Sequence, residues 1–198
     1  MLVDGAFFGR NVICTFQYFI HIAVILDKNT PFLVFRQIHV FDEPMTVHES
    51  SLSPHIHSIL AARIGKVEKA YQLFLHATRL DLNDYNNEAD QGLHITSMPG
   101  SWLAIVRGFA GMQVLKETLC FSPVIPQKWD SYSFKVNYLK NTLHIRLIEL
   151  EIAADGFRVE IEIEISLTAG SKVDIQVYGH PYTLERGTEL KINMPMCK

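Results

Sequence analysis

Apolar residues recur at two different periods along this chain of 198 residues. In the first half the period is helical and predicts three helices, at residues 53–64, at 67–78 and from about Pro99 to Phe109. Ser53-Pro54 is a typical helix start, because serine caps the first turn and proline fits within it. Only two or three residues around Gly65 join the first two helices, which predicts an antiparallel hairpin.

After about Thr118 the period changes to two, which is typical of half-buried strands. The clearest run, Phe157–Ile165, has one apolar face and one charged face, and its glutamates are expected on a solvated face: Glu160, Glu162 and Glu164. Four further runs alternate in the same way, at 132–138, 143–147, 173–177 and 190–192. These strands predict a small antiparallel β-sandwich with one solvated face per sheet.

Two details refine the predicted strands. The apolar phase slips by one residue between Leu147 and Ile148, which indicates either a bulge or two separate strands. Asp155-Gly156 and Ala169-Gly170-Ser171 are expected to be turns, because glycine accepts the backbone angles that tight turns need.

The periods divide the chain into three parts. Residues 44–112 are expected to be helical and residues 118–198 to form the β-sandwich, whereas residues 1–43 sustain neither period and read as an atypical leader. Within the leader, Val12–Leu26 is almost wholly apolar, but it is shorter than the roughly 20 residues that a membrane helix needs. No small-residue cleavage site follows it, so a buried or disordered segment is expected rather than a signal peptide or a membrane anchor.

Composition and charge narrow the range of possible partners and of possible roles for the cysteines. A net charge of -3 gives no reason to expect nucleic acid as a partner. The three cysteines, Cys14, Cys120 and Cys197, show neither metal-ligand nor redox spacing, and their odd number argues against a disulfide framework. A reducing cytoplasm is the simplest compartment for such a chain.

The segment Gly92–Trp102 is the strongest candidate for chemistry. It brings the imidazole of His94 and the hydroxyls of Thr96 and Ser97 together just before a predicted helix. Free N–H groups and the helix dipole at such a point favour negative charge, so the segment predicts an anion site. A lone histidine is more often structural than catalytic, and spacing alone supports no stronger statement.

A second polar stretch, Thr46–Pro54, also precedes a helix, and ordinary capping is the simpler explanation of its serines. His48-Glu49 does not begin a zinc helix, because position 52 is leucine where the second histidine would stand. No metal site is therefore expected, and neither a Walker loop, a Rossmann fingerprint nor a nucleophile elbow is present.

Taken together, these stretches resemble glycoside hydrolase family 65, the disaccharide phosphorylases, and in particular those acting on maltose, with trehalose, kojibiose and nigerose phosphorylases as further relatives. The resemblance runs from about Glu43 to the C-terminus and is carried by four segments: Thr46–Pro54, Arg79–Asn87, Asp90–Met98 and Gly100–Val106. It implies a fold in which the helices are the last ones of an (α/α)6 barrel and the strands are the family's C-terminal β-sandwich.

The resemblance also implies a reaction without a cofactor. Inorganic phosphate, as co-substrate, attacks an α-glucoside such as maltose with inversion and releases β-glucose 1-phosphate and a free sugar. By this resemblance His94, Thr96 and Ser97 bind phosphate, and further support comes from three residues: His48, Gly100 and Ser101. Glu49 resembles the general base of hydrolytic relatives, and here it is expected to orient phosphate or a helix end.

The chain departs from the family pattern in three ways. No residue matches the family's glutamic general acid, so the chain alone is expected to be inactive. Residues 1–42 do not resemble the barrel, which suggests a truncated or frame-shifted reading of a longer gene. Pro99 stands where the family more often has a small residue, and it removes one N–H donor although it suits a first helical turn.

Two other functions stay open. The chain could be a non-catalytic structural or association module, or an inactive remnant, and its partner could be a second copy or a complementing N-terminal fragment. Hydrolysis with Glu49 as base is the weaker alternative, because the segment His94–Ser97 favours phosphate over water.

Overall fold

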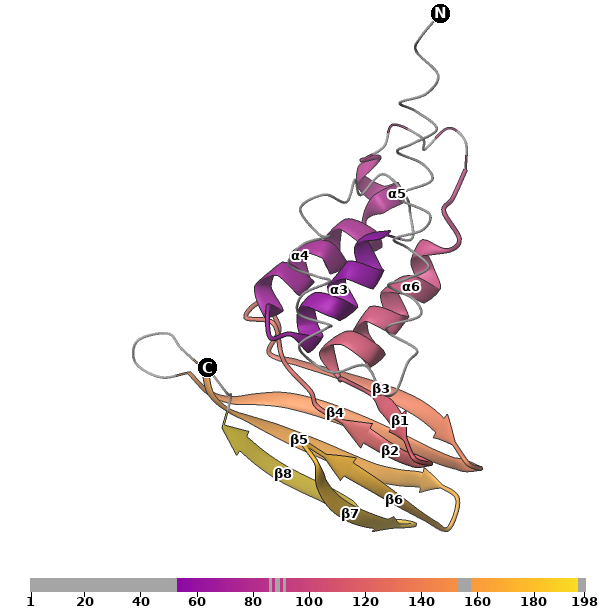
Figure 1. The fold of residues 1–198 in the computed structure, drawn as a ribbon, viewed down its shortest axis with the longest axis vertical. Coiled ribbons are helices and arrows are strands. Elements are labelled where there is room, and N and C mark those ends of the chain that lie inside the picture. Colours follow the sequence, from indigo (N-terminus) through magenta and orange to yellow (C-terminus); the bar gives the residue numbers. More distant parts are fainter. Residues whose placement is uncertain (1–52, 86, 88–89, 91, 153–157, 196–198) are drawn as a thin grey trace, which may run out of the picture. The chain divides into compact units, whose positions relative to one another are not determined.

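The computed structural model describes residues 53–85, 87, 90, 92–152 and 158–195 (Figure 1). The chain divides into two compact units, with the division in the sequence between Gly108 and Phe109. The predicted leader, 1–43, and the predicted turn at Asp155-Gly156 lie outside the described residues. None of the helices in the described part is long and apolar enough to cross a membrane.

The first unit contains the helices. They are α3 (Ser53–Arg63), α4 (Val67–Thr78), the one-turn α5 (Leu80–Asn83) and α6 (Ser97–Leu103), which continues as the π-helical segment η3 (Ala104–Phe109). The bounds of α3 and α4 agree with the sequence prediction to within one residue. The third helix starts at Ser97, two residues earlier than predicted, and α5 was not predicted.

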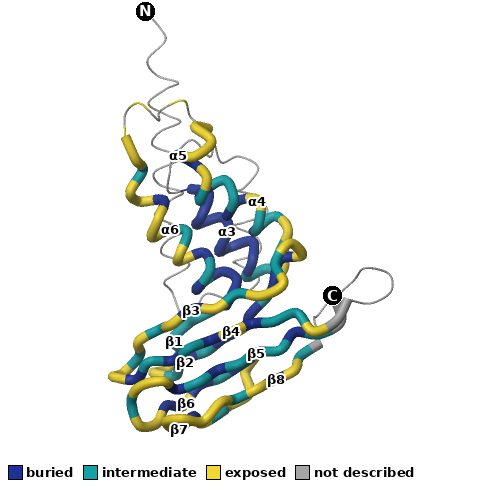
Figure 2. Tube along the Cα trace, turned by 180° about the vertical axis from the view of Figure 1, so that it is seen from behind, coloured by how far each residue is buried: buried dark blue, intermediate teal, exposed yellow. Residues whose placement is uncertain are grey.

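Helix α3 is the centre of this unit, and ten of its eleven residues are buried (Figure 2). It contacts both α4 and α6, and the Ser58 hydroxyl donates a hydrogen bond of 2.8 Å to the Ala70 carbonyl of α4. Helix α6 approaches α3 closely because Gly100 has no side chain: a Cβ there would lie 2.3 Å from Cε1 of His55.

The second unit consists of two four-stranded sheets. One has the order β1-β2-β6-β7 and the other the order β3-β4-β5-β8. The strands are β1 (Gln113–Leu115), β2 (Thr118–Phe121), β3 (Ser131–Tyr138), β4 (Asn141–Ile152), β5 (Arg158–Ala169), β6 (Lys172–Val177), β7 (His180–Glu185) and β8 (Glu189–Pro195). A few helices followed by a small β-sandwich is the fold class that the sequence predicts.

One pair of strands departs from the antiparallel expectation: β2 and β6 run parallel, with Leu119 opposite Ile175. A parallel pair needs a long connection, and here β3, β4 and β5 of the other sheet lie between the two strands in sequence. All other described pairs are antiparallel.

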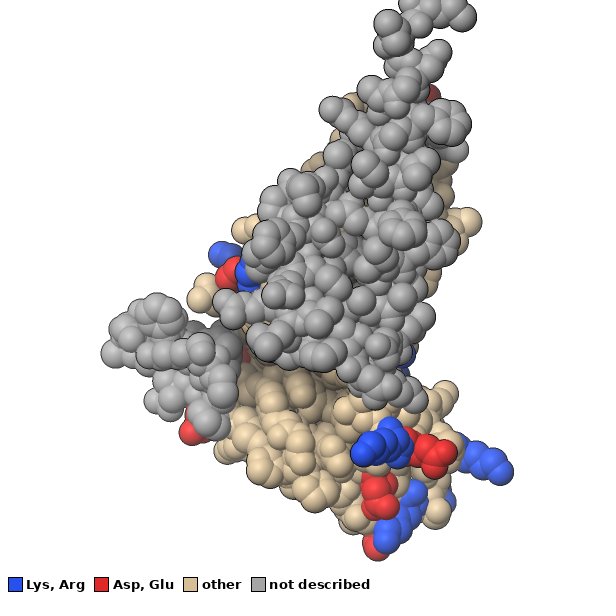
Figure 3. All heavy atoms as spheres, viewed as in Figure 1, with Lys and Arg blue, Asp and Glu red and all other residues tan. Residues whose placement is uncertain are grey.

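The core of the sandwich follows the period of two. The inward residues of β4 and β5 are at most 2% exposed: Leu143, Ile145, Leu147, Ile161, Ile163, Ile165 and Leu167. On the opposite face, Glu164 of β5 accepts hydrogen bonds from Arg146 of β4 and Lys191 of β8. Acidic and basic side chains lie next to one another on this unit (Figure 3).

The strand with the predicted phase slip is not broken, and its bulge lies beyond the slip, because Leu147 and Ile148 pair regularly with Ile163 and Glu162. Strand β4 is continuous from Asn141 to Ile152, and its register with β5 shifts between Glu149 and Glu151. Leu150, the residue without a partner on β5 at this shift, is 44% exposed.

Candidate functional site

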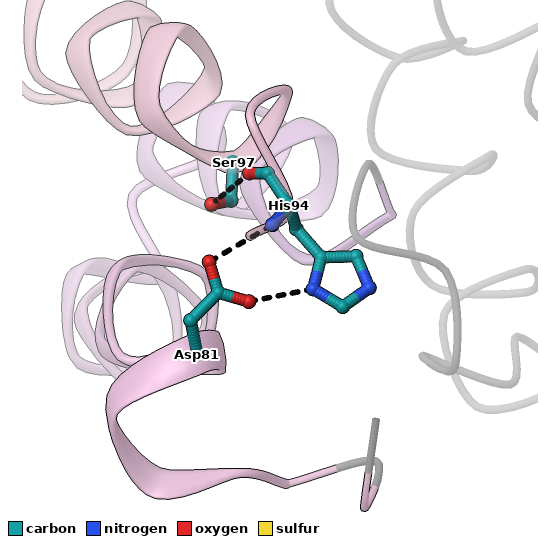
Figure 4. Close-up of polar contacts among 3 residues, drawn as sticks. All are labelled: Asp81, His94 and Ser97. Carbon is teal, nitrogen blue, oxygen red and sulfur yellow. Dashed lines mark hydrogen bonds and ion pairs between the residues drawn. The ribbon is translucent and has the colours of Figure 1, made fainter. Parts of the chain in front are cut away.

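His94 lies in the short segment between α5 and α6, and Asp81 of α5 holds it at two points (Figure 4). One carboxylate oxygen accepts the backbone N–H of His94 at 3.0 Å, and the other lies 2.6 Å from ring atom Nδ1. The side chains of His94 and Asp81 are 27% and 16% exposed. The backbone and the ring of His94 are thus both held by the same carboxylate.

Helix α5 is only one turn long, and local contacts fix it. Leu80 is 3% exposed and anchors the turn in the core of the helical unit. Nη2 of Arg79 donates to Oδ1 of Asn83 at 3.1 Å, and Nδ2 of Asn83 donates to the Tyr85 hydroxyl at 2.6 Å. The Tyr85 ring in turn lies 4.7 Å from the ring of His76 on α4. These contacts hold the turn that carries Asp81.

The first N–H groups of α6 make hydrogen bonds to the segment before the helix. The N–H of Ser97 donates to the carbonyl of His94 at 2.9 Å, and that of Met98 to the carbonyl of Ile95 at 3.3 Å. The chain makes a tight turn before the helix, and this turn uses the amide groups that an anion would need. These two N–H groups are therefore already hydrogen-bonded within the chain.

The hydroxyls of the segment have local roles in this conformation. The Ser97 hydroxyl, on a buried residue, donates to the His94 carbonyl at 2.7 Å, and the Ser101 hydroxyl donates to the Ser97 carbonyl at 2.7 Å. Thr96 is exposed and directly precedes α6, without a capping hydrogen bond from its side chain. Gly100 packs against His55 and is buried.

Most of the predicted site residues lie in one described segment of the sequence, Gly92–Ser101. His48 and Glu49 lie outside the described residues. No group of three or more histidine, cysteine or acidic side chains in the described part could hold a metal ion. Sequence reasoning missed Asp81, which stands 13 residues before His94 in a stretch that reads as a polar loop.

Large apolar side chains around the segment are exposed. Leu93 and Ile95 on either side of His94 are 69% and 74% exposed, and Met98 and Trp102 of α6 are 58% and 48% exposed. Several exposed apolar side chains in one short segment are typical of a surface that another part of a protein covers.

Comparison with known proteins decides the family. Residues 19–103 match the family model described as "Glycosyl hydrolase family 65 central catalytic domain". Residues 112–184 match the family model described as "Glycosyl hydrolase family 65, C-terminal domain". The chain belongs to glycoside hydrolase family 65. The first match begins at residue 19 and ends at residue 103, and the second begins at residue 112, next to the start of β1.

Individual members of family 65 are also similar. The chain is 49% identical to maltose phosphorylase of Bacillus subtilis (strain 168) over 150 residues, which are 76% of this chain and 18% of that protein. It is 37% identical to alpha,alpha-trehalose phosphorylase of Geobacillus stearothermophilus over 168 residues, or 85% of this chain and 20% of that protein.

Among solved structures, a putative kojibiose phosphorylase from human microbiome has a TM-score of 0.74 and 33% sequence identity. The match covers 84% of this chain and 21% of that one. This chain thus spans about a fifth of the length of the family 65 proteins that it matches.

Proposed function

We propose that this chain is the C-terminal part of an inverting disaccharide phosphorylase and supplies its phosphate site. His94, Thr96 and Ser97 are the phosphate ligands in this proposal, and inorganic phosphate is a co-substrate, with no cofactor. Membership of family 65 supports it, because the similar proteins are named as maltose, trehalose and kojibiose phosphorylases. The observation that carries it is the double contact between Asp81 and His94, which prepares one imidazole for a ligand.

In the proposed reaction a phosphate oxygen attacks the anomeric carbon of an α-glucoside such as maltose. The bond from that carbon to the bridging oxygen breaks, and a glutamic acid protonates the departing oxygen. The products are β-glucose 1-phosphate and glucose. No residue here matches that acid, so we assign it to the large part of the family's catalytic domain that lies outside this similarity.

The described residues would bind and orient phosphate. An imidazole and neighbouring hydroxyls offset the charge of phosphate and hold it in line with the bond that breaks. Ser97 can donate to phosphate only after its hydroxyl rotates away from the His94 carbonyl. Gly100 and Ser101 would support the segment from α6, and we assign supporting roles to His48 and Glu49 as well.

The exposed apolar side chains favour a partner for this surface. We propose that the preceding part of a family 65 catalytic domain covers Leu93, Ile95, Met98 and Trp102, either within one longer chain or as a complementing fragment. A homodimer and a cytoplasmic location complete the proposal.

Phosphate binding by this chain tests the site. Titration of the chain with inorganic phosphate, followed by calorimetry and by NMR, is expected to perturb His94, Thr96 and Ser97. His94→Gln should weaken binding about tenfold or more, because a charge-assisted hydrogen bond is lost. His144→Gln, in strand β4 of the other unit, is the matched control and should bind as the wild type does. Equal affinity of His94→Gln and wild type would exclude the site.

Turnover needs the rest of the catalytic domain. In a chimera, this chain replaces the matched 150 residues of the Bacillus subtilis maltose phosphorylase, and β-glucose 1-phosphate is measured with maltose, trehalose and kojibiose. We expect phosphorolysis by the chimera, a raised KM for phosphate after His94→Gln, and no turnover by this chain alone. Turnover by the chain alone would show that it contains its own acid, and an inactive, well-folded chimera would favour the non-catalytic alternative.

A further inference from the structure

The contact between Asp81 and His94 has two parts, one to the backbone and one to the imidazole ring. A single hydrogen bond to the backbone N–H of His94 would suffice to anchor the segment, and one oxygen of Asp81 makes it, at 3.0 Å. The second oxygen lies 2.6 Å from Nδ1, so it determines which ring nitrogen carries a proton as well as where the ring lies.

A carboxylate only accepts hydrogen bonds, so Nδ1 must carry the proton in this contact. The neutral ring then has its lone pair at Nε2, and the cationic ring has a second N–H there. In either state, the ring can contact phosphate only through Nε2, because Nδ1 is held by Asp81.

We propose that Asp81 is a positioning residue that acts on phosphate through His94, by holding the proton on Nδ1 and presenting Nε2 to the ligand. The inference rests on the proposed function of His94 as a phosphate ligand. Asp81 itself does not touch phosphate in this proposal. Its side chain is 16% exposed, and both of its oxygens are engaged with His94.

The isosteric change Asp81→Asn separates this role from anchoring. The amide oxygen of asparagine can still accept the backbone N–H of His94, so the segment keeps its anchor. The amide NH₂ group then faces Nδ1 and can only donate, which moves the proton of the neutral ring to Nε2. The variant is therefore expected to change the tautomer of one ring and to keep the anchor of the segment.

The test combines ¹⁵N NMR of the histidine side chains with phosphate titration of the full chain. In the wild type, Nδ1 of His94 should show the chemical shift of a protonated nitrogen, with and without phosphate. In Asp81→Asn the neutral ring should carry its proton on Nε2, and the affinity for phosphate should fall about tenfold, as for the loss of one charge-assisted contact.

Two further variants serve as controls for this interpretation of Asp81→Asn. Asp81→Glu keeps a carboxylate and should retain both the proton on Nδ1 and most of the affinity, which a purely structural role would not predict. Asp174→Asn is the matched control for the loss of one carboxylate: Asp174 accepts the Thr183 hydroxyl at 2.6 Å in the other unit, and its change should leave phosphate binding unaltered.

The outcomes separate the inference from the proposed function. If His94→Gln weakens binding and Asp81→Asn does not, the role of Asp81 is excluded and the phosphate site stands. If neither the wild type nor His94→Gln binds phosphate, the proposed function fails and this inference fails with it. If Asp81→Asn does not fold, the wild-type tautomer still decides, because a proton on Nε2 alone would overturn the proposal.

Discussion

Gly100 of α6 lies directly against the imidazole of His55 on α3, so that a Cβ at position 100 would meet ring atoms at 2.3 Å. The glycine which the sequence suggests as a support for phosphate therefore has a packing role that the structure explains. Because α6 begins three residues after His94, the packing of α6 against α3 also determines where the candidate site lies.

Gly100→Ala is expected to destabilise the helical unit by about 1–3 kcal/mol, because the new methyl group overlaps a buried ring. Gly108→Ala is the matched comparison, since its Cβ would lie 3.3 Å from Cα of Ile59 and needs a much smaller adjustment. Alanine favours helices over glycine by about 1 kcal/mol, so this second change should be nearly neutral. Urea unfolding followed by circular dichroism measures both, and equal stability of the two variants would contradict the observed packing.

The backbone contact of Asp81 can be measured separately from its ring contact. In Asp81→Ala, the His94 N–H loses its acceptor and should exchange with deuterium about fivefold faster, as expected for losing roughly 1 kcal/mol of local protection. The Ala70 N–H, which donates to the Lys66 carbonyl at 2.9 Å, is an internal reference and should not change. Unchanged exchange at His94 would mean that this amide is protected in another way.

The turn between β3 and β4 holds two non-glycine residues in the left-handed region, Leu139 with φ 45° and Lys140 with φ 63°. Two-residue hairpins of this kind favour Asn-Gly, so the double change Leu139→Asn with Lys140→Gly should raise stability by about 1 kcal/mol. Leu139 is 68% exposed, and few contacts are lost. Leu139→Ala keeps the unfavourable backbone and serves as the control. Thermal unfolding tests the prediction, and a lower melting temperature for the double variant would refute it.

Acid should weaken the second unit through Glu164. The hydrogen bond from Lys191 lowers the pKa of Glu164 below its usual value of 4.5, against a smaller opposing effect of burial. The folded state thus favours the ionised carboxylate. Its contribution to stability is present above pH 4.5 and is lost as the pH falls through the lowered pKa.

Glu164→Gln should therefore be less stable than wild type at neutral pH, and the difference should disappear in acid. Urea midpoints at several pH values measure it. Glu160→Gln, on the same face of β5, removes a carboxylate that makes no ion pair with a described residue and should show a smaller pH-dependent difference. A difference between Glu164→Gln and wild type that persists in strong acid would show that the effect is not electrostatic.

The long periodic segments were predictable because packing and sequence agree there. The apolar positions of α3 and α4, the Ser53-Pro54 start and Gly65 suffice to place both helices. Helix α5 was missed because four residues are too few to show a period. Asp81 was missed with it, since its partner His94 is found only when the chain folds back on itself.

The missed strands have a different explanation. Strands β1 and β2 are three and four residues long, and their turn, Lys116-Glu117, takes left-handed angles without the Asn-Gly signature. The turn at Leu139-Lys140 is of the same kind, whereas the turn at Tyr178-Gly179, before the missed strand β7, carries only one glycine. Tertiary pairing decides these turns, and a local pattern cannot reveal it.

The parallel pairing of β2 with β6 has a consequence for the order of folding. It joins residues as far apart as Cys120 and Gln176, which are 56 positions apart in sequence. The hairpins β3–β4 and β6–β7 close over two-residue turns and have little loop entropy to overcome, but β2 must wait until the intervening strands have formed. The sheet β1-β2-β6-β7 should accordingly complete last and set the slow phase of refolding.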